Sequence, residues 1–183
     1  MTSSHPDKPY PILIGSQEIY RGRVINVRVD EVEIENGRNV RREVVEHPGA
    51  VVIVPVDAEG HIHWVRQYRY AADRALLELP AGTLEAGEEP LACAQREIQE
   101  ETGHSARNWI LLGRFFTAPG FCTEYMHAFA ATELTPSHAD ADEDEDIEVE
   151  VLTLEESLAR VDAGEIEDAK SIAALWLFVR KRA

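Results

Sequence analysis

The chain has 183 residues, of which 44% are hydrophobic, a balance that excludes a disordered chain and a mini-protein held by disulfides. Its 18 Lys and Arg stand against 34 Asp and Glu, giving a formal charge of −16, so we expect no nucleic-acid partner and no anionic membrane surface. The longest apolar run, residues 50–55, is too short to span a bilayer, and the first ten residues lack the apolar core of a signal peptide. We therefore expect a soluble, cytoplasmic protein with reduced cysteines.

The patterns along the chain predict a mixture of strands and helices. Residues 1–16 are expected to form a flexible arm. Residues 17–46 predict a small antiparallel β-sheet, because apolar residues alternate with charges around the hairpin signal Asn36-Gly37. Residues 47–183 are expected to form the main domain, of the α/β or α+β class. Its predicted strands are 50–56, 62–70, 76–80, 110–116, 126–132 and 147–154; its helices are 88–102, 154–162 and 168–181; and residues 82–87 are a loop.

The segment that carries chemistry is residues 82–104, with the sequence GTLEAGEEPLACAQREIQEETGH. With Leu91, Ala94, Ile98 and Thr102 on the packed face of a helix, an arc about 100° wide remains for the side chains of Glu97, Glu100 and Glu101. Neighbouring like charges destabilise a helix, and a cation in the arc relieves the repulsion. Oxygen ligands favour Mg²⁺ or Mn²⁺ over zinc. Taken alone, the three glutamates are more typical of a solvated acidic face on a surface helix.

The spacing of Gly82, Glu88, Arg96, Glu97, Glu100, Glu101 and Gly103 resembles the Nudix box of the Nudix hydrolases, although His104 stands where the box usually ends on an apolar residue. The resemblance implies a Nudix fold, in which a mixed β-sheet lies between helices. It also implies an enzyme that hydrolyses a nucleoside diphosphate linked to another moiety with the help of divalent ions. The implied metal ligands are Glu97, Glu100, Glu101 and the carbonyl oxygen of Ala81, while Glu88 and Arg96 form a supporting salt bridge.

Four further segments, residues 42–49, 65–69, 77–82 and 118–124, resemble ADP-ribose pyrophosphatases within that family. Pro119 lies where this subfamily has a marker proline. The acidic segment Glu143–Ile147 resembles its late catalytic loop, which makes Glu143 the base and Glu145 a further metal ligand, with the register of residues 142–146 left open.

This resemblance implies hydrolysis of ADP-ribose to AMP and ribose 5-phosphate with Mg²⁺ or Mn²⁺, in which Glu100 and Glu101 join Glu143 as catalytic groups. Subfamily members usually form homodimers that exchange N-terminal strands, so residues 17–46 are expected to complete the partner's site. Arg66 and Arg69 face opposite sides of one strand, and the resemblance selects Arg69 for the substrate. The implied substrate contacts are Arg42, Glu43, Arg69, Gly82, Thr83, Ala118, Pro119, Gly120 and Glu124.

Several alternatives remain open from the sequence. Arg42 and Glu43 are also typical of a surface ion pair, and Glu124 of an exposed loop acid. Tyr20 and Phe121 fit either adenine stacking or core packing. The substrate is alternatively flavin adenine dinucleotide or a sugar nucleotide, and a nucleotide sensor without catalysis is a further alternative. His61 and His63 are expected to be solvated, and Cys93 is not expected to be a nucleophile.

Overall fold

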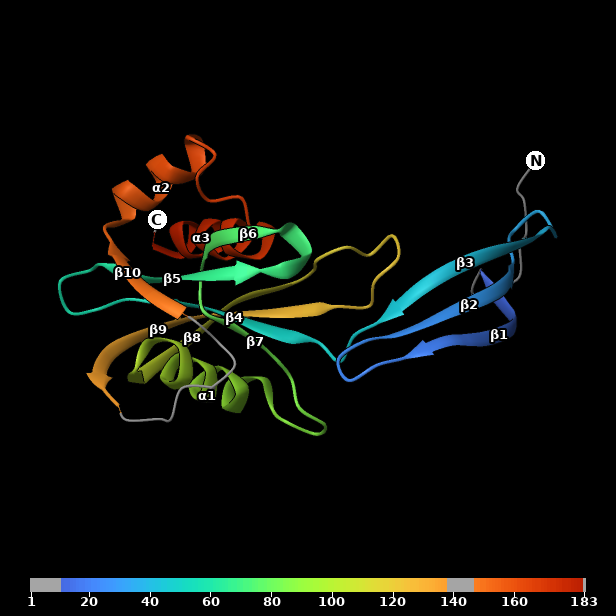
Figure 1. Ribbon diagram of the computed structural model, residues 1–183, viewed down its shortest axis with the longest axis horizontal. Coiled ribbons are helices and arrows are strands. Elements are labelled where there is room, and N and C mark those ends of the chain that lie inside the picture. The colour runs from blue at the N-terminus through green and yellow to red at the C-terminus, as the bar shows by residue number, and fades with distance from the viewer. Residues whose placement is uncertain (1–10, 138–146, 183) are drawn as a thin grey trace, which may run out of the picture. The chain divides into compact units, whose positions relative to one another are not determined.

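The computed structural model describes residues 11–137 and 147–182 (Figure 1). The chain divides into two compact units. The first comprises Met1–Pro48 with Ala118–Glu124, and the second comprises Gly49–Thr117 with Tyr125–Ala183. Each unit is described by itself.

The first unit is built on a three-stranded antiparallel sheet in the order β1-β2-β3. Its strands are β1 (Ile12–Arg21), β2 (Asn26–Glu33) and β3 (Asn39–Glu46). The turn between β2 and β3 contains Gly37 at φ 76°, a backbone conformation that glycine adopts without strain, as the Asn36-Gly37 signal predicts. Residues 12–16 were expected in the arm but belong to β1, where the Ser16 hydroxyl donates a hydrogen bond of 2.6 Å to Asp30 Oδ1.

A distant segment completes this unit. The backbone N–H of Val45 donates to the Phe121 carbonyl at 2.7 Å, and the Thr123 N–H donates to the Val45 carbonyl at 2.9 Å. His47 N–H also donates to Thr123 Oγ1, a contact between residues 76 apart in the sequence. The predicted substrate loop, residues 118–124, is therefore held against the end of β3.

The second unit contains two further sheets. One has the order β7-β4-β9-β8, with β4 parallel to β9 and the other neighbours antiparallel. The other has the antiparallel order β10-β5-β6. The strands are β4 (Ala50–Pro55), β5 (Ile62–Arg69), β6 (Arg74–Glu78), β7 (Ala81–Thr83), β8 (His104–Phe116), β9 (Tyr125–Pro136) and β10 (Ile147–Leu152), and a 3-10 turn, η1 (Tyr70–Ala72), joins β5 to β6.

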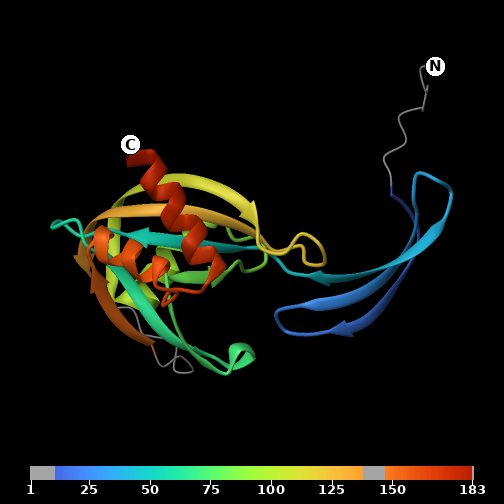
Figure 2. The ribbon, with the colours of Figure 1, turned by 90° about the horizontal axis from the view of Figure 1, so that it is seen from above.

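Three helices, α1 (Pro90–Thr102), α2 (Leu154–Asp162) and α3 (Ala169–Arg182), cover these sheets. Figure 1 shows α1 and α3 on opposite sides of the sheet that contains β4, and Figure 2 shows α3 lying across one face of that sheet. Strand alternation explains this arrangement, because Val51 and Ile53 pack in one apolar cluster with α1, while Val52 and Val54 pack in the other with α3. The described residues thus form the mixed α+β fold that the sequence predicts.

The ends of several elements differ from the sequence prediction. Strands β8 and β9 extend well beyond 110–116 and 126–132, because they pair along their whole length although their outer residues mix polar and apolar side chains. In α3, Trp176 is 59% exposed although it shares the helical spacing of neighbouring apolar residues, and the helix instead buries Ala174, Leu175 and Phe178. No helix within the described ranges is long and apolar enough to cross a membrane.

One buried hydrogen bond links α2 to the core. The indole Nε1–H of Trp64 donates to Ser157 Oγ at 3.0 Å, and both residues are fully buried. Ser157→Ala leaves the indole N–H without its acceptor, so we expect the free energy of unfolding to fall by about 1–3 kcal/mol. Urea denaturation measures the change. As a control, Ser105→Ala removes an exposed hydrogen bond to Thr135 and should change stability by less than about 0.5 kcal/mol. Equal effects of the two substitutions would contradict the prediction.

Candidate active site

Helix α1 presents its glutamates next to a sheet edge. Pro90 stands at its start, where no intrahelical N–H is needed, and Gly103 ends it at φ 68° with its N–H bonded to the Gln99 carbonyl. The face that packs on the sheet includes Cys93, Ala94 and Ile98, each fully buried. Leu91 was expected on that face but is 40% exposed, because the contact is centred on residues further along the helix.

Strand β7 lies directly beside these glutamates. Residues 82–87 were predicted as a loop, but Ala81–Thr83 pair with β4, a short pairing that leaves no periodic signal in three residues. The Ala81 N–H donates to Glu101 Oε2 at 3.1 Å, and Glu101 is 7% exposed. A Cβ on Gly82 would lie 1.7 Å from Glu97 Oε1, so the Glu97 carboxylate occupies the space that any side chain at residue 82 needs.

Arg96 balances the charges of the glutamates. Its Nη1 donates to Glu97 Oε1 at 2.7 Å and to Glu100 Oε2 at 2.8 Å. Its Nε lies 3.3 Å from Glu88 Oε1, which is the ion pair that the resemblance implies. Partial burial disfavours the ionised form of Glu88, but hydrogen bonds from Arg96 and from the Glu85 N–H lower its pKa overall. In the described part of the chain, the cation within the glutamate arc is this guanidinium.

The donor set fits a hard divalent ion. Glu97 lies beside Gly82, Glu101 accepts the Ala81 N–H, and Glu100 shares Arg96 with Glu97. Carboxylate oxygens of this kind suit Mg²⁺ or Mn²⁺. Across residues 11–137 and 147–182, no three acidic, histidine or cysteine side chains are already gathered as a complete metal site.

Cys93, on the buried side of α1, has an unreactive thiol. Burial, followed by the charges of Glu97 and Glu88, raises the pKa of its thiol to about 12. Only the thiolate is nucleophilic, so the thiol stays protonated and inert at neutral pH. The structure agrees with the expectation that Cys93 is not a nucleophile.

Strand β5 separates its two arginines as the alternation predicts. Arg66 pairs with Glu150 of β10 at 2.9 Å. Arg69 instead forms a two-pronged contact with Glu78, at 2.9 Å from Nε and 2.8 Å from Nη2. The hydrogen bonds to Glu78, followed by the charges of Glu78, Glu101 and Asp168, raise the pKa of Arg69 although burial opposes the shift. The two arginines thus have different partners on opposite faces of β5.

Sequence reasoning missed Glu78 and Lys170. The Glu78 side chain is 2% exposed and also bonds to Lys170, which in turn lies 2.9 Å from Asp168. A single acid inside the apolar strand segment Leu77–Leu79 is a signal that could have identified Glu78, because isolated buried carboxylates are costly. Lys170 carries no comparable signal, since lysines at helix starts are usually solvated.

The remaining predicted substrate residues lie in the first unit. Arg42 and Glu43 are neighbours in the middle of β3 and therefore point to opposite faces of its sheet. Arg42 is paired in register with Asp30, and Glu43 with Val29. In the predicted substrate loop, Glu124 lies 3.7 Å from His47 Nε2. One sheet face can therefore present Arg42 or Glu43, but not both.

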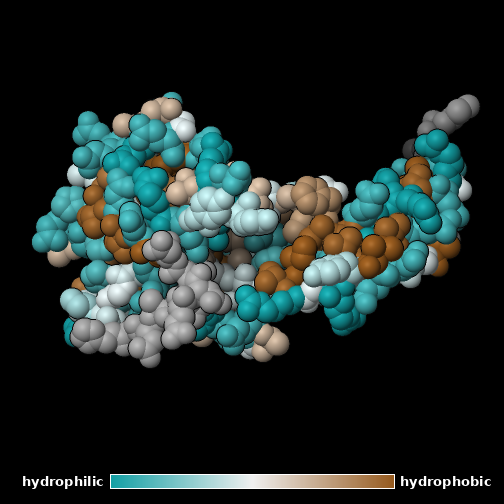
Figure 3. Space-filling model, in the orientation of Figure 1, coloured by the Kyte–Doolittle hydropathy of each residue, from teal (hydrophilic) through white to brown (hydrophobic). Residues whose placement is uncertain are grey.

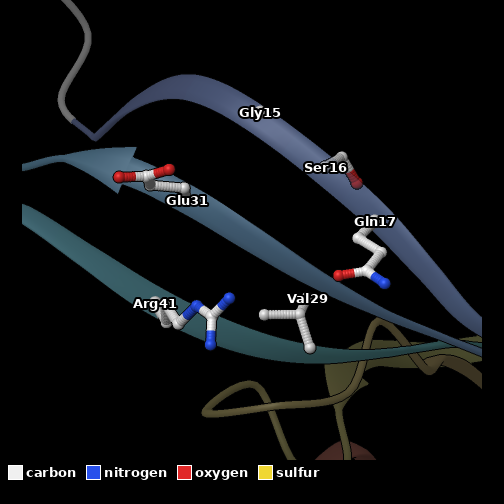
Figure 4. Close-up of a pocket in the computed structure, with 6 residues that line it drawn as sticks. All are labelled: Gly15, Ser16, Gln17, Val29, Glu31 and Arg41. Atoms are coloured by element: carbon white, nitrogen blue, oxygen red, sulfur yellow. The ribbon is translucent and has the colours of Figure 1, made fainter.

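A hollow of about 200 Å³ lies on the Glu43 face of this sheet (Figure 4). It forms beside Gly15, which has no side chain, and Gln17, Glu31 and Arg41 provide its polar lining. None of the lining residues comes from α1 or β7, so the hollow is distinct from the glutamate site.

The prediction for His63 is not met, and two further predicted residues lie outside the described part of the chain. His63 is not solvated but 7% exposed, and its ring meets that of His104 edge-on at 4.9 Å, so the expectation for His63 is wrong. It is buried because its side of β5 is covered in the fold, which the sequence does not reveal. Glu143 and Glu145, the expected base and additional metal ligand, lie in residues 138–146, outside the described residues.

Comparison with known protein families shows the family to which the chain belongs. Residues 45–175 match the NUDIX domain family. This match covers more than half of the chain, and the chain belongs to the Nudix family of hydrolases, as its box predicts. Divalent-metal dependence is general in that family.

Three individual relatives and one solved structure are similar to this chain. An ADP-ribose pyrophosphatase of Bacillus subtilis is 42% identical over 172 residues, covering 93% of each chain. An ADP-ribose pyrophosphatase of Mycobacterium tuberculosis is 46% identical over 66% of this chain and 59% of its own length. A GDP-mannose pyrophosphatase of Citrobacter koseri is 35% identical over 77% and 80%, respectively. A solved structure described as ADP compounds hydrolase superposes with a TM-score of 0.82 at 26% identity, covering 93% of this chain and 92% of that chain.

The contact between Gly82 and Glu97 makes a direct prediction. Gly82→Ala places a methyl group where Glu97 Oε1 lies, so the carboxylate must move and we expect turnover to fall by about 100-fold or more, as misplacement near a reacting centre does. Steady-state kinetics measure turnover, and urea denaturation checks that the fold is kept. Gly15→Ala, where a Cβ meets open space, is the control and should retain activity. Normal turnover of Gly82→Ala would show that the position of the Glu97 carboxylate is not needed for the reaction.

Proposed function

We propose that this Nudix enzyme hydrolyses the diphosphate of ADP-ribose to AMP and ribose 5-phosphate with Mg²⁺, for which Mn²⁺ can substitute. The observation that carries the proposal is the 42% identity to the Bacillus subtilis ADP-ribose pyrophosphatase along 93% of both chains. The glutamates, Arg96 and Gly82 of the box, gathered around β7, support it.

The chain's own residues divide the work in this proposal. When bound, a divalent ion neutralises phosphate charge and makes water more acidic. Glu97, Glu100, Glu101 and the Ala81 carbonyl would hold it, with Glu145 as a further ligand, while Glu88 keeps Arg96 in place beside them. Glu143 accepts the proton of the attacking water. The water oxygen forms a bond to phosphorus, and the oxygen bridging the two phosphates leaves with its electron pair.

Substrate contacts follow from the same proposal. Arg69 offers a fixed cation to the diphosphate, and the Gly82 and Thr83 backbone lies where close approach is possible. Glu124, with Ala118, Pro119 and Gly120, contacts the terminal ribose, while β3 contributes Arg42 or Glu43 according to the face that the substrate meets. The protein acts in the cytoplasm on this small molecule, without nucleic-acid or membrane partners.

The proposed assembly is a homodimer in which residues 17–46 complete the partner's site. Figure 3 shows hydrophobic side chains along the three-stranded sheet. Among them, Leu13 and Ile14 of β1 are 60% and 52% exposed, and Ile19 and Tyr20 are 55% and 57% exposed. Such a concentration of exposed apolar residues on one small sheet is typical of an interaction surface.

A second candidate is the same chemistry on a sugar nucleotide. The GDP-mannose pyrophosphatase relative, 35% identical over 77% of this chain, favours it. Flavin adenine dinucleotide is a further member of the class to be tested. A nucleotide sensor is disfavoured, because the box glutamates Glu97, Glu100 and Glu101 are all present.

Product analysis with a substrate panel tests the proposal. The panel contains ADP-ribose, GDP-mannose, flavin adenine dinucleotide and NADH, each with Mg²⁺, and each with EDTA as the metal-free control. We expect AMP to form fastest from ADP-ribose and formation to stop with EDTA. Faster turnover of another panel member would show that this nucleotide, and not ADP-ribose, is the preferred substrate. Binding of ADP-ribose without turnover would favour the nucleotide sensor.

In the same assay, Glu101→Gln is expected to lower turnover by about 100-fold or more, since a ligand charge is lost while its shape is kept. Because Glu101 receives the Ala81 N–H and an amide oxygen still accepts that bond, the fold should persist. The thermal midpoint provides this check. Near-normal turnover of Glu101→Gln with Mg²⁺ would remove it from the proposed ligand set.

Complementation between two inactive variants tests strand exchange. Glu101→Gln disables the glutamate site, and the double variant Arg42→Ala, Glu43→Ala disables the N-terminal contribution. If each site combines both units from different protomers, refolding the two variants together gives mixed dimers with one intact site, about a quarter of all sites. Recovery of activity near that fraction is expected. Two dimers that each remain inactive after mixing would show that each site is built within one protomer.

A further inference from the structure

A buried network of charges lies behind Arg69. Glu78, at the end of β6, has a side chain only 2% exposed and is held by Arg69 and Lys170. Its burial favours the neutral acid, but the two cations outweigh burial and lower its pKa, so Glu78 is ionised. A buried carboxylate is tolerated when it is paired and hydrogen-bonded in this way.

Arg69 is fixed by this network rather than by the sheet alone. Its Nε and Nη2 donate to the two oxygens of Glu78 at 2.9 and 2.8 Å, a planar two-point contact that holds the guanidinium in one orientation. The side chain is still 38% exposed. A cation that is rigid on one side and accessible on the other is suited to binding an anionic group.

Lys170 changes the electrostatic field that Arg69 presents to an anion. If Glu78 bonded to Arg69 alone, its negative charge would offset the field that the guanidinium presents to an anion. Lys170 also bonds to that carboxylate, so part of the negative charge of Glu78 is offset by Lys170 instead of offsetting the charge of Arg69. Asp168 bonds to Lys170 at 2.9 Å and also accepts from the Ser171 N–H at 3.0 Å, so its charge is shared with the start of α3.

The same network anchors the strand that leads to the glutamate site. The Leu79 N–H donates to Ser171 Oγ at 2.7 Å, and Ser171 Oγ donates to Asp168 at 2.5 Å. Two residues after Leu79, Ala81 donates its N–H to Glu101. Hydrogen bonds thus connect the start of α3 both to Arg69, through Glu78, and to the Leu79 backbone, from which the chain continues into β7.

From these contacts we infer that Glu78 and Lys170 are positioning residues for substrate binding: Glu78 orients Arg69 toward the diphosphate, and Lys170 preserves the positive field of Arg69. This inference rests on the proposed function. It assigns neither residue a contact with the substrate, so both act through Arg69.

A double-mutant cycle tests the role of Glu78. KM, kcat and urea stability are measured for Glu78→Gln, Arg69→Gln and the double variant with the nucleotide that the panel selects. We expect Glu78→Gln to raise KM about tenfold with kcat changed less than about threefold, and to have no further effect on KM once Arg69 is replaced. An equal effect in both backgrounds, or none in either, overturns the inference.

Two further arms make the result decisive. Lys170→Gln should also raise KM, and Lys170→Arg should restore it, whereas loss of packing alone would not depend on charge. Arg66→Gln is the matched control, because it breaks an ion pair on the same strand but the opposite face, and its KM should not change. If Glu78→Gln does not fold, Glu78→Asp keeps the charge and draws the guanidinium back by one methylene, and an unchanged KM then overturns the inference.

The proposed function and this inference fail in different ways. Absence of turnover by the unmodified protein contradicts the proposed function and is visible before any substitution. In that case the same cycle is measured on the dissociation constant of ADP-ribose, where independence from Arg69 and Glu78 overturns the inference.

Discussion

The close contact between β7 and α1 is the constraint on which the candidate site depends. Glutamates at three- and four-residue spacing repel one another on an isolated helix. Here the Ala81 N–H binds Glu101, the missing side chain of Gly82 leaves room for Glu97, and Arg96 bridges Glu97 and Glu100. The strand thus holds Glu97 and Glu101, and Arg96 holds Glu100 beside Glu97.

Arg69 and Arg96 solve the same electrostatic problem in different ways. Arg96 lies among the glutamates and pairs directly with Glu97 and Glu100. Arg69 is held from behind by Glu78, which also pairs with Lys170. A strongly acidic protein that acts on an anionic substrate needs cations held at its site, and the network behind Arg69 fixes one in place.

The sequence predicted the glutamate helix and the mixed fold, because box spacing and apolar periodicity are local properties. It also placed Arg66 and Arg69 on opposite faces of one strand, since strand alternation needs no tertiary information. The pairing of β7, the buried state of His63 and the partners of Glu78 were not predictable. Each depends on which distant segments meet, and Lys170 reaches Glu78 across 92 residues of sequence. The same dependence explains why Leu91 and Trp176, both apolar and at helical spacing, turned out exposed.

The attachment of residues 118–124 to β3 has a consequence for synthesis of the chain. The β1-β2-β3 sheet is made of adjacent strands and can pair as soon as they leave the ribosome. Its contact through His47 and Thr123, however, joins residues 76 apart, so this part of the unit stays open until most of the second unit has been translated. During that interval Val45 has no partner at Phe121 and Thr123, and the nascent chain exposes an unpaired strand end. The final closure of the N-terminal unit is therefore a late event that follows translation of β4 through β8.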